Sequence, residues 1–268
     1  MEMRLNIKLP TSWNELSKKQ LENISLYIYD NHLQVKDLED ESKHLQANTK
    51  LYYCVVKELL SNNNPLKSYL ALKRIPVREY ADYCKFIFQT NDRTKFIPYY
   101  IISGKRYYAP HFRLKNCTIG EFAFVDSVYY RWKETNNEVL LSLLCSILYR
   151  PKSQHPSEID IRKPFSKILA ETNADHWQKA SLKKRLAIAT TFEGCRNYIV
   201  SIYPNIFPKS TSINRTKFKP KYVPFGELIS SKIEFDPSKL EKVQSLLVNE
   251  FFSIYERELI EIKKRPRK

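Results

Sequence analysis

The stretch VLLSLLCSIL at residues 139–148 is apolar almost all the way round at helical spacing. A helix without a polar face has to be enclosed by other elements, so this stretch predicts the central helix of a globular fold. Tyr149, Arg150 and Pro151 follow it, and proline prevents the helix from continuing and disfavours helical backbone at the residue before it. We therefore expect the other elements to be arranged around residues 139–148.

The composition of the chain favours a mainly α fold. The 268 residues are 43% hydrophobic and 13% aromatic, which is enough to bury a sizeable core. Only four glycines are present, so phosphate-binding loops, dinucleotide fingerprints and most tight hairpin turns are not expected. We predict a single mainly helical domain with one β-hairpin, a basic arm rich in proline and lysine, and a C-terminal helix.

Capping motifs and apolar periodicity place the other helices. Ser12 with Glu15, Ser17 with Gln20, and Thr118 with Glu121 have the spacing of capping boxes, in which the two side chains satisfy free backbone amides. Helices are predicted from these and from the apolar spacing over residues 21–28, 50–60, 66–73, 77–88, 122–132, 165–171, 181–203 and 237–254. Within residues 181–203, Gly194 is expected to permit a close helix contact or a kink.

The period changes from helical to extended at residues 95–109, where we predict the hairpin. A two-residue turn at Ser103 and Gly104 would pair Tyr100 with Tyr107 and Tyr99 with Tyr108. The tyrosines are favoured as structural cross-strand pairs. The alternative is a stacking surface for single-stranded nucleic acid, because aromatic faces and cations together bind bases. Its residues would be Tyr99, Tyr100, Lys105, Arg106, Tyr107 and Tyr108.

The net positive charge is accounted for by three stretches that contain no acidic residue. The formal net charge is +16, and residues 93–120, 194–226 and 262–268 hold six, six and five Lys or Arg. The rest of the chain is therefore close to neutral, and the basic segments indicate contact with a polyanion or an acidic protein. We divide the chain into a helical core with the hairpin at 1–208, a basic arm at 209–236, and a C-terminal helix with a basic tail at 237–268.

The arm is the predicted partner-binding segment. Four prolines, at 204, 208, 220 and 224, punctuate the stretch that holds five of its cations, a pattern that resists packing into a core and suits binding to a partner. The candidate partner-binding residues are Lys209, Arg215, Lys217, Lys219 and Lys221. They fit docking on a protein partner, and the alternative is neutralisation of nucleic-acid phosphates.

No catalytic or metal-ligating pattern stands out, so we predict no enzyme activity, no metal and no cofactor. The five cysteines lack a C-x-x-C pair and the five histidines lack an H-E-x-x-H motif. Glu158 and Asp160 could share one face of a strand and hold a divalent cation, but we interpret residues 158–163 as a solvated mixed-charge segment. The N-terminus lacks the apolar core of a secretory signal and no apolar run could span a membrane, which favours a soluble intracellular protein.

Short motifs along most of the chain resemble a family. They are Leu9 and Pro10 with Trp13, Leu16, Ser17, Gln20 and Leu21; residues 118–122; residues 148–151; and residues 224–228. Together they resemble poorly characterised helical proteins of phage and prophage tail and virion assembly, similar to tail assembly chaperones. The resemblance implies a non-enzymatic assembly or structural role with other phage proteins as partners, in the host cytoplasm or the virion. It transfers no site residue and has no counterpart of the basic arm, which leaves a cytoplasmic nucleic-acid-binding protein as the alternative.

Overall fold

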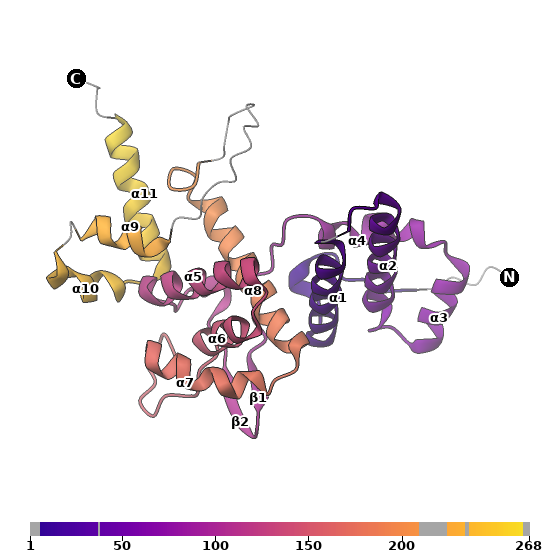
Figure 1. Cartoon of the computed structure of the whole chain (residues 1–268), viewed down its shortest axis with the longest axis horizontal. Helices are drawn as coiled ribbons and strands as arrows, with labels where there is room; N and C mark the ends of the chain where they lie inside the picture. Colours follow the sequence, from indigo (N-terminus) through magenta and orange to yellow (C-terminus); the bar gives the residue numbers. More distant parts are fainter. Residues whose placement is uncertain (1–5, 37, 209–223, 234–235, 265–268) are drawn as a thin grey trace. The chain divides into compact units, whose positions relative to one another are not determined.

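The computed structural model describes residues 6–36, 38–208, 224–233 and 236–264. These residues form eleven α-helices, four short 3-10 helices and one two-stranded antiparallel hairpin (Figure 1). The predicted mainly α fold with one hairpin is therefore confirmed. Contacts within the chain define two compact units, of which unit 1 is Met1–Arg93 with Ser181–Gly194 and unit 2 is Thr94–Ala180 with Cys195–Lys268. The predicted division of the chain near residues 208 and 236 stays a prediction.

Unit 1 is helical. Its elements are the 3-10 helices η1 (Trp13–Glu15) and η2 (Val77–Tyr80), the helices α1 (Lys18–Lys36), α2 (Glu41–Leu60), α3 (Pro65–Arg74) and α4 (Ala81–Phe88), and the first part of α8 (Leu182–Ile202). Helices α1 and α2 pack together. Helix α2 begins nine residues before the predicted start of residues 50–60, because the Asp40 side chain caps it by accepting from the Ser42 amide.

The capping box at Ser17 and Gln20 is confirmed. The Ser17 amide donates to Gln20 Oε1 at 3.1 Å, and the Gln20 amide donates to Ser17 Oγ at 3.3 Å. Gln20 is fully buried, and its side-chain amide also donates to the carbonyls of Glu58 and Leu59 at 3.1 Å each. One residue thus caps α1 and attaches its first turn to the end of α2.

The capping box predicted at Ser12 and Glu15 was wrong. Ser12 makes no side-chain cap, and the segment is the short 3-10 helix η1. The Glu15 carboxylate accepts instead from the amide of Thr11 at 2.7 Å. Trp13 is buried and its indole nitrogen donates to the carbonyl of Phe86, so burial of this ring decides the local structure.

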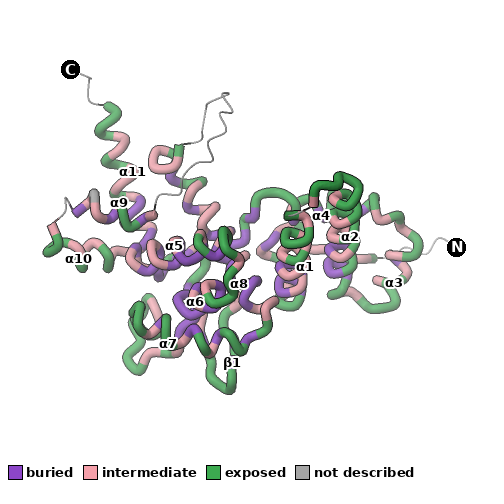
Figure 2. Tube along the Cα trace, viewed as in Figure 1, coloured by how far each residue is buried: buried purple, intermediate pink, exposed green. Residues whose placement is uncertain are grey.

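Unit 2 is built around the predicted central helix. Its elements are β1 (Tyr99–Ile102), β2 (Lys105–Tyr108), η3 (Phe112–Leu114), α5 (Ile119–Thr135), α6 (Glu138–Leu148), α7 (Lys167–Gln178), the end of α8, α9 (Phe225–Lys232), η4 (Pro237–Lys239), α10 (Leu240–Gln244) and α11 (Val248–Lys264). Helix α6 packs against both α5 and α7 and is buried from Leu141 onward apart from Leu143 (Figure 2). The sequence-based expectation for residues 139–148 is confirmed, although Val139 at its start is exposed.

The C-terminal helix is broken where a single helix was predicted over residues 237–254. Asp236 caps η4, and α10 ends at Gln244 before α11 begins at Val248. Between them the chain runs beside the entrance to α5. The Ile119 amide donates to the Leu246 carbonyl at 2.8 Å, and the Val248 amide donates to the Cys117 carbonyl at 2.9 Å. Leu246 and Val248 thus form backbone hydrogen bonds with the segment before α5 instead of within a helix. The residues between α10 and α11 therefore leave the helical conformation.

Gly194 is buried at a close approach of the backbone within unit 1. A Cβ atom placed there would lie 2.1 Å from the carbonyl oxygen of Arg93 and 2.6 Å from its amide nitrogen. The expected close contact is therefore present, and it is made to the backbone of a loop. The Arg93 side chain holds that loop in place, because its Nε donates to Thr191 Oγ1 at 3.2 Å and its Nη1 to the Trp13 carbonyl.

We expect Gly194→Ala to destabilise the protein, since a methyl group would overlap backbone atoms that cannot rotate away. Overpacking of this kind costs about 1–3 kcal/mol or more, and urea unfolding followed by circular dichroism would measure it. Gly226→Ala is the matched control, because no atom lies within 4 Å of its added methyl group. Equal unfolding midpoints for the two variants would contradict the proposed contact.

Candidate functional site

The hairpin has the predicted register, with Tyr99 opposite Tyr108 and Tyr100 opposite Tyr107. Ser103 and Gly104 form its turn with positive φ angles of 47° and 77°. The side chains alternate between two faces. Tyr100 and Tyr107 are each 1% exposed, whereas Tyr99 is 42% exposed.

The buried tyrosines belong to the core of unit 2. The rings of Tyr100, Tyr107 and Tyr149 lie 6.1, 5.6 and 5.6 Å from the ring of Trp177. Burial also raises the pKa of Tyr107 above its usual value. Tyr100 and Tyr107 are therefore structural residues, and including them in a nucleic-acid stacking surface was wrong.

The other residues of the predicted stacking surface lie on the outer face of the hairpin. Tyr99, Lys105 and Arg106 are exposed and Tyr108 is half-buried. The Arg106 guanidinium lies over the Tyr99 ring at 4.4 Å from its centre. The candidate residues of the arm, Lys209, Arg215, Lys217, Lys219 and Lys221, all lie outside the described residues.

The interpretation of residues 158–163 as solvated holds for four of them, which are exposed, and is wrong for Asp160 and Arg162. The side chain of Arg162 is fully buried and that of Asp160 is only 18% exposed. The Arg162 guanidinium binds the Asp160 carboxylate with Nε at 3.0 and 3.1 Å and Nη2 at 2.8 Å. Its Nη1 donates to the Leu148 carbonyl at 2.7 Å, which attaches the loop to the end of α6.

A second arginine and a second acid complete what we call the buried ion network, formed by Glu121, Arg150, Asp160 and Arg162. Arg150 Nη1 lies 2.9 Å from Glu121 Oε1, and Arg162 Nη1 lies 3.3 Å from the same oxygen. Arg150 Nη2 reaches Asp160 Oδ2 at 3.4 Å. Two positive and two negative groups therefore balance in the interior, which is how buried charges are tolerated.

The Cys117 thiol is also part of this environment. Its sulfur donates to Glu121 Oε1 at 3.3 Å, and it is fully buried. Burial, with the nearby Glu121 charge, raises the pKa of Cys117 far above that of a free thiol, whereas Arg162 and Arg150 oppose this shift. The thiol is therefore protonated at neutral pH and is not a nucleophile.

The network leaves Asp160 without free oxygens for a metal, because the Arg162 fork covers both of them. Among the described residues, no group of three or more His, Cys, Asp or Glu side chains is placed to hold a metal ion. The helices of the described ranges also include none with the length and apolarity needed to cross a bilayer.

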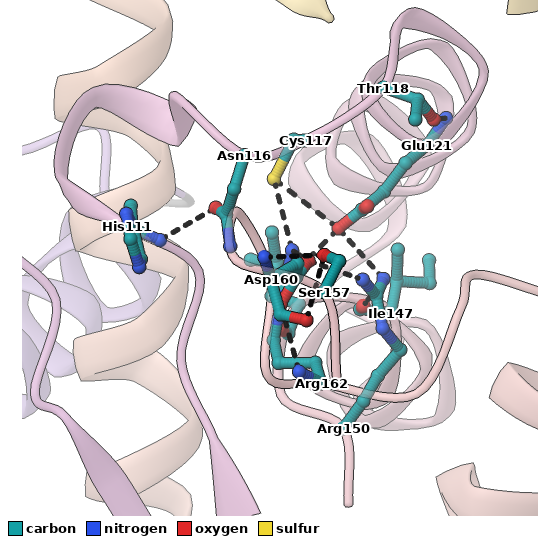
Figure 3. A network of polar contacts seen from close by, with 11 residues as sticks. His111, Asn116, Cys117, Thr118, Glu121, Ile147, Arg150, Ser157, Asp160 and Arg162 are labelled. Atoms are coloured by element: carbon teal, nitrogen blue, oxygen red, sulfur yellow. Dashed lines mark hydrogen bonds and ion pairs between the residues drawn. The ribbon is translucent and has the colours of Figure 1, made fainter. Parts of the chain in front are cut away.

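One feature of the sequence indicates this network and was not recognised in the sequence analysis. Only the Thr118 half of the predicted capping box forms: Thr118 Oγ1 accepts at 3.2 Å from the amide of Glu121, the third helical residue of α5. However, the Glu121 carboxylate faces Arg150 and Arg162 (Figure 3). That feature is Arg150, which lies directly before Pro151 at the end of the apolar helix. An arginine so close to a buried helix needs a buried acidic partner.

An open groove of about 1340 Å³ lies beside the network in unit 2. Its floor is α5, with Gly120, Ala123, Phe124 and Ser127, and its sides come from the loop before α7 and from α9 and α10. Apolar lining residues are Phe124, Phe165, Ile229 and Leu240. Polar and charged ones include Ser127, Lys167, Glu227, Glu241 and Gln244.

The buried ion network supports one side of this groove. Arg162 and Asp160 fix the loop that leads through Pro164 to Phe165, and Glu121 and Arg150 themselves line the groove. Glu121 and Arg150 are thus already paired at the groove and hold its shape. Comparisons of this chain with protein-family models, curated proteins and solved structures found no match.

Tyr107→Ala should destabilise the protein by about 3–5 kcal/mol, the usual loss when a buried aromatic side chain is truncated. Tyr99→Ala is the control on the exposed face of the same hairpin, with an expected loss below about 1 kcal/mol. Thermal and urea unfolding would measure both. If the two losses were similar, the assignment of the two faces would be incorrect.

Glu121→Gln should cost about 3–5 kcal/mol, because it leaves two buried arginines facing a single carboxylate. Glu158→Gln makes the same chemical change at an exposed position of the neighbouring loop and should leave the urea midpoint unchanged. A wild-type midpoint for Glu121→Gln would show that the network does not stabilise unit 2.

Proposed function

We propose that this protein is a non-enzymatic protein-binding factor of phage or prophage tail or virion assembly, and that it holds a segment of a partner protein in the groove. The observation that carries the proposal is the groove itself. Its volume of about 1340 Å³ exceeds the roughly 300–1,000 Å³ typical of small-molecule sites. A site of this size suits a helix or an extended peptide.

The lining of the groove also favours a protein segment. Half-buried phenylalanines at positions 124 and 165 offer apolar contact, while Gln244, Ser127 and Glu241 offer hydrogen-bonding groups around them. Protein interfaces combine an apolar centre with a polar surround in this manner. A partner segment with apolar side chains on one face would match this arrangement.

The two charged groups that the groove shares with the buried ion network are not free to act as an acid or a base. Glu121 and Arg150 line the groove, but each is paired within the buried ion network. A general acid or base needs a free position beside the substrate and a pKa near the working pH. The assignment to phage assembly rests on the resemblance of the short motifs to tail and virion assembly proteins.

We expect Ala123→Arg to abolish partner binding, because a long cationic side chain on the floor of the groove would occupy the space of the bound segment. The partner is to be sought among proteins encoded by neighbouring genes, and isothermal titration calorimetry with each purified protein would measure its affinity. Loss of at least tenfold in affinity, about 1.4 kcal/mol, is the expected result.

Ala81→Arg is the matched control, since Ala81 is exposed at the start of α4 in unit 1. It should bind the partner as the wild type does, and both variants should keep the wild-type unfolding midpoint. Wild-type affinity of Ala123→Arg would exclude the groove as the binding site. Absence of binding to every neighbouring tail or virion protein would argue against the assembly role.

A further inference from the structure

The loop after the hairpin has a backbone conformation that its sequence does not favour. Arg113 and Leu114 have positive φ angles of 58° and 56° inside η3. Left-handed backbone costs a non-glycine residue about 1–3 kcal/mol, and it is rare for a bulky side chain such as leucine. Two such residues in succession are kept only where the surroundings impose them.

The contacts that impose this conformation are defined. The Arg113 amide donates to the Thr94 carbonyl at 3.0 Å, and the His111 amide donates to Asn116 Oδ1 at 2.7 Å. Leu114 is fully buried beneath the loop. This backbone conformation keeps Phe112 at the surface, where 46% of the residue is exposed. It also buries Leu114, which anchors the loop.

Cations gather on the aromatic rings of this loop. Lys115 Nζ lies 4.3 Å from the centre of the Phe112 ring, and the Arg113 guanidinium lies 5.5 Å from it. On its other side, Arg113 lies 4.3 Å from the ring of Tyr198 in the part of α8 that belongs to unit 2. An exposed ring with two flanking cations can stack a base and hold its phosphates.

The positive charge of this loop is not neutralised within the described part of the chain. Neither Arg113 nor Lys115 forms an ion pair with a described acidic residue, and the buried Arg113 Nε has no hydrogen-bond partner there. The surrounding stretch, residues 93–120, contains no Asp or Glu. The arginines of the buried ion network are different, because each faces a carboxylate.

The hairpin presents a second pair of the same kind. Arg106 covers the exposed ring of Tyr99, and the Tyr99 ring also contacts that of Tyr108 at 6.5 Å. Lys105 and Arg106 are exposed there. Aromatic platforms with adjacent cations thus recur within one acid-free stretch of the chain.

We propose that the loop Phe112–Lys115 is a binding site for single-stranded nucleic acid, in which a base stacks on Phe112 while Lys115 and Arg113 contact phosphates. Stacking on an aromatic ring accepts any base, so we expect little sequence preference. The site is separate from the groove, and the proposal does not depend on the groove binding a protein. An acidic protein would use the cations but would gain little from an exposed phenylalanine, which favours nucleic acid.

Fluorescence anisotropy of the full chain with a labelled oligothymidylate, between about 50 and 200 mM salt, would test this site. Phe112→Ala should weaken binding roughly tenfold and leave the salt dependence unchanged, because it removes stacking and no charge. Lys115→Gln should weaken binding and reduce the slope of log affinity against log salt by about 0.7, the effect of one phosphate contact on a single strand.

Tyr83→Ala and Lys85→Gln are matched controls, since both side chains are exposed on α4 in unit 1 and the two changes are equivalent. They should bind as the wild type does, and all four variants should keep the wild-type unfolding midpoint. The proposal is overturned if the wild type does not bind at low salt, or if the control variants lose as much affinity.

Two further outcomes would also reject the loop as the site. Replacing Lys217, Lys219 and Lys221 with Glu could abolish binding while Phe112→Ala has no effect, which would place the contact on the arm. Equal affinity for polyglutamate and for oligothymidylate, with Phe112→Ala neutral for both, would identify an acidic protein surface as the ligand class.

Discussion

The structure of unit 2 depends on two arginines that are buried inside it. Arg150 and Arg162 bring two positive charges into the interior, and Glu121 and Asp160 balance them. The Arg150 backbone also pairs with Tyr108 at the end of the hairpin, with N to O distances of 2.8 and 3.2 Å. A single cluster therefore joins the hairpin, α5, α6 and the loop before α7. Because removing any one charge leaves the others unbalanced, these elements are expected to hold their positions together.

The start of α5 carries several of these constraints at once. Thr118 caps the helix, Glu121 enters the ion network, and Gly120 lies 3.1 Å, measured from an added Cβ, from the Gln244 side chain of α10. The backbone of Cys117 and Ile119 pairs with Leu246 and Val248. One turn of chain is thus tied to both the ion network and the C-terminal helices. The groove lies over this turn, so its floor is among the most constrained parts of unit 2.

Local patterns predicted local structure well. The capping box of Ser17, the apolar helix at 139–148 and the register of the tyrosine hairpin were all predicted, because each depends on residues close together in the sequence. Burial of Arg162 was missed, since its partners Glu121 and Leu148 are distant in sequence and a polar loop carries no periodicity. The break before Val248 was missed for the same reason, because backbone pairing with Cys117 leaves no mark on side-chain pattern. The loop at Arg113 has no glycine, the residue that would have indicated left-handed backbone.

Helix α8 belongs to unit 1 up to Gly194 and to unit 2 from Cys195, so unit 1 is discontinuous in the chain. A ribosome completes residues 1–93 well before it synthesises Ser181–Gly194, and the nascent N-terminal helices must wait for their last partner. During that interval the contacts that residues 181–194 later make with residues 1–93, among them that of Thr191 with Arg93, are absent. Unit 1 is therefore expected to complete its folding only after Ser181–Gly194 has been synthesised.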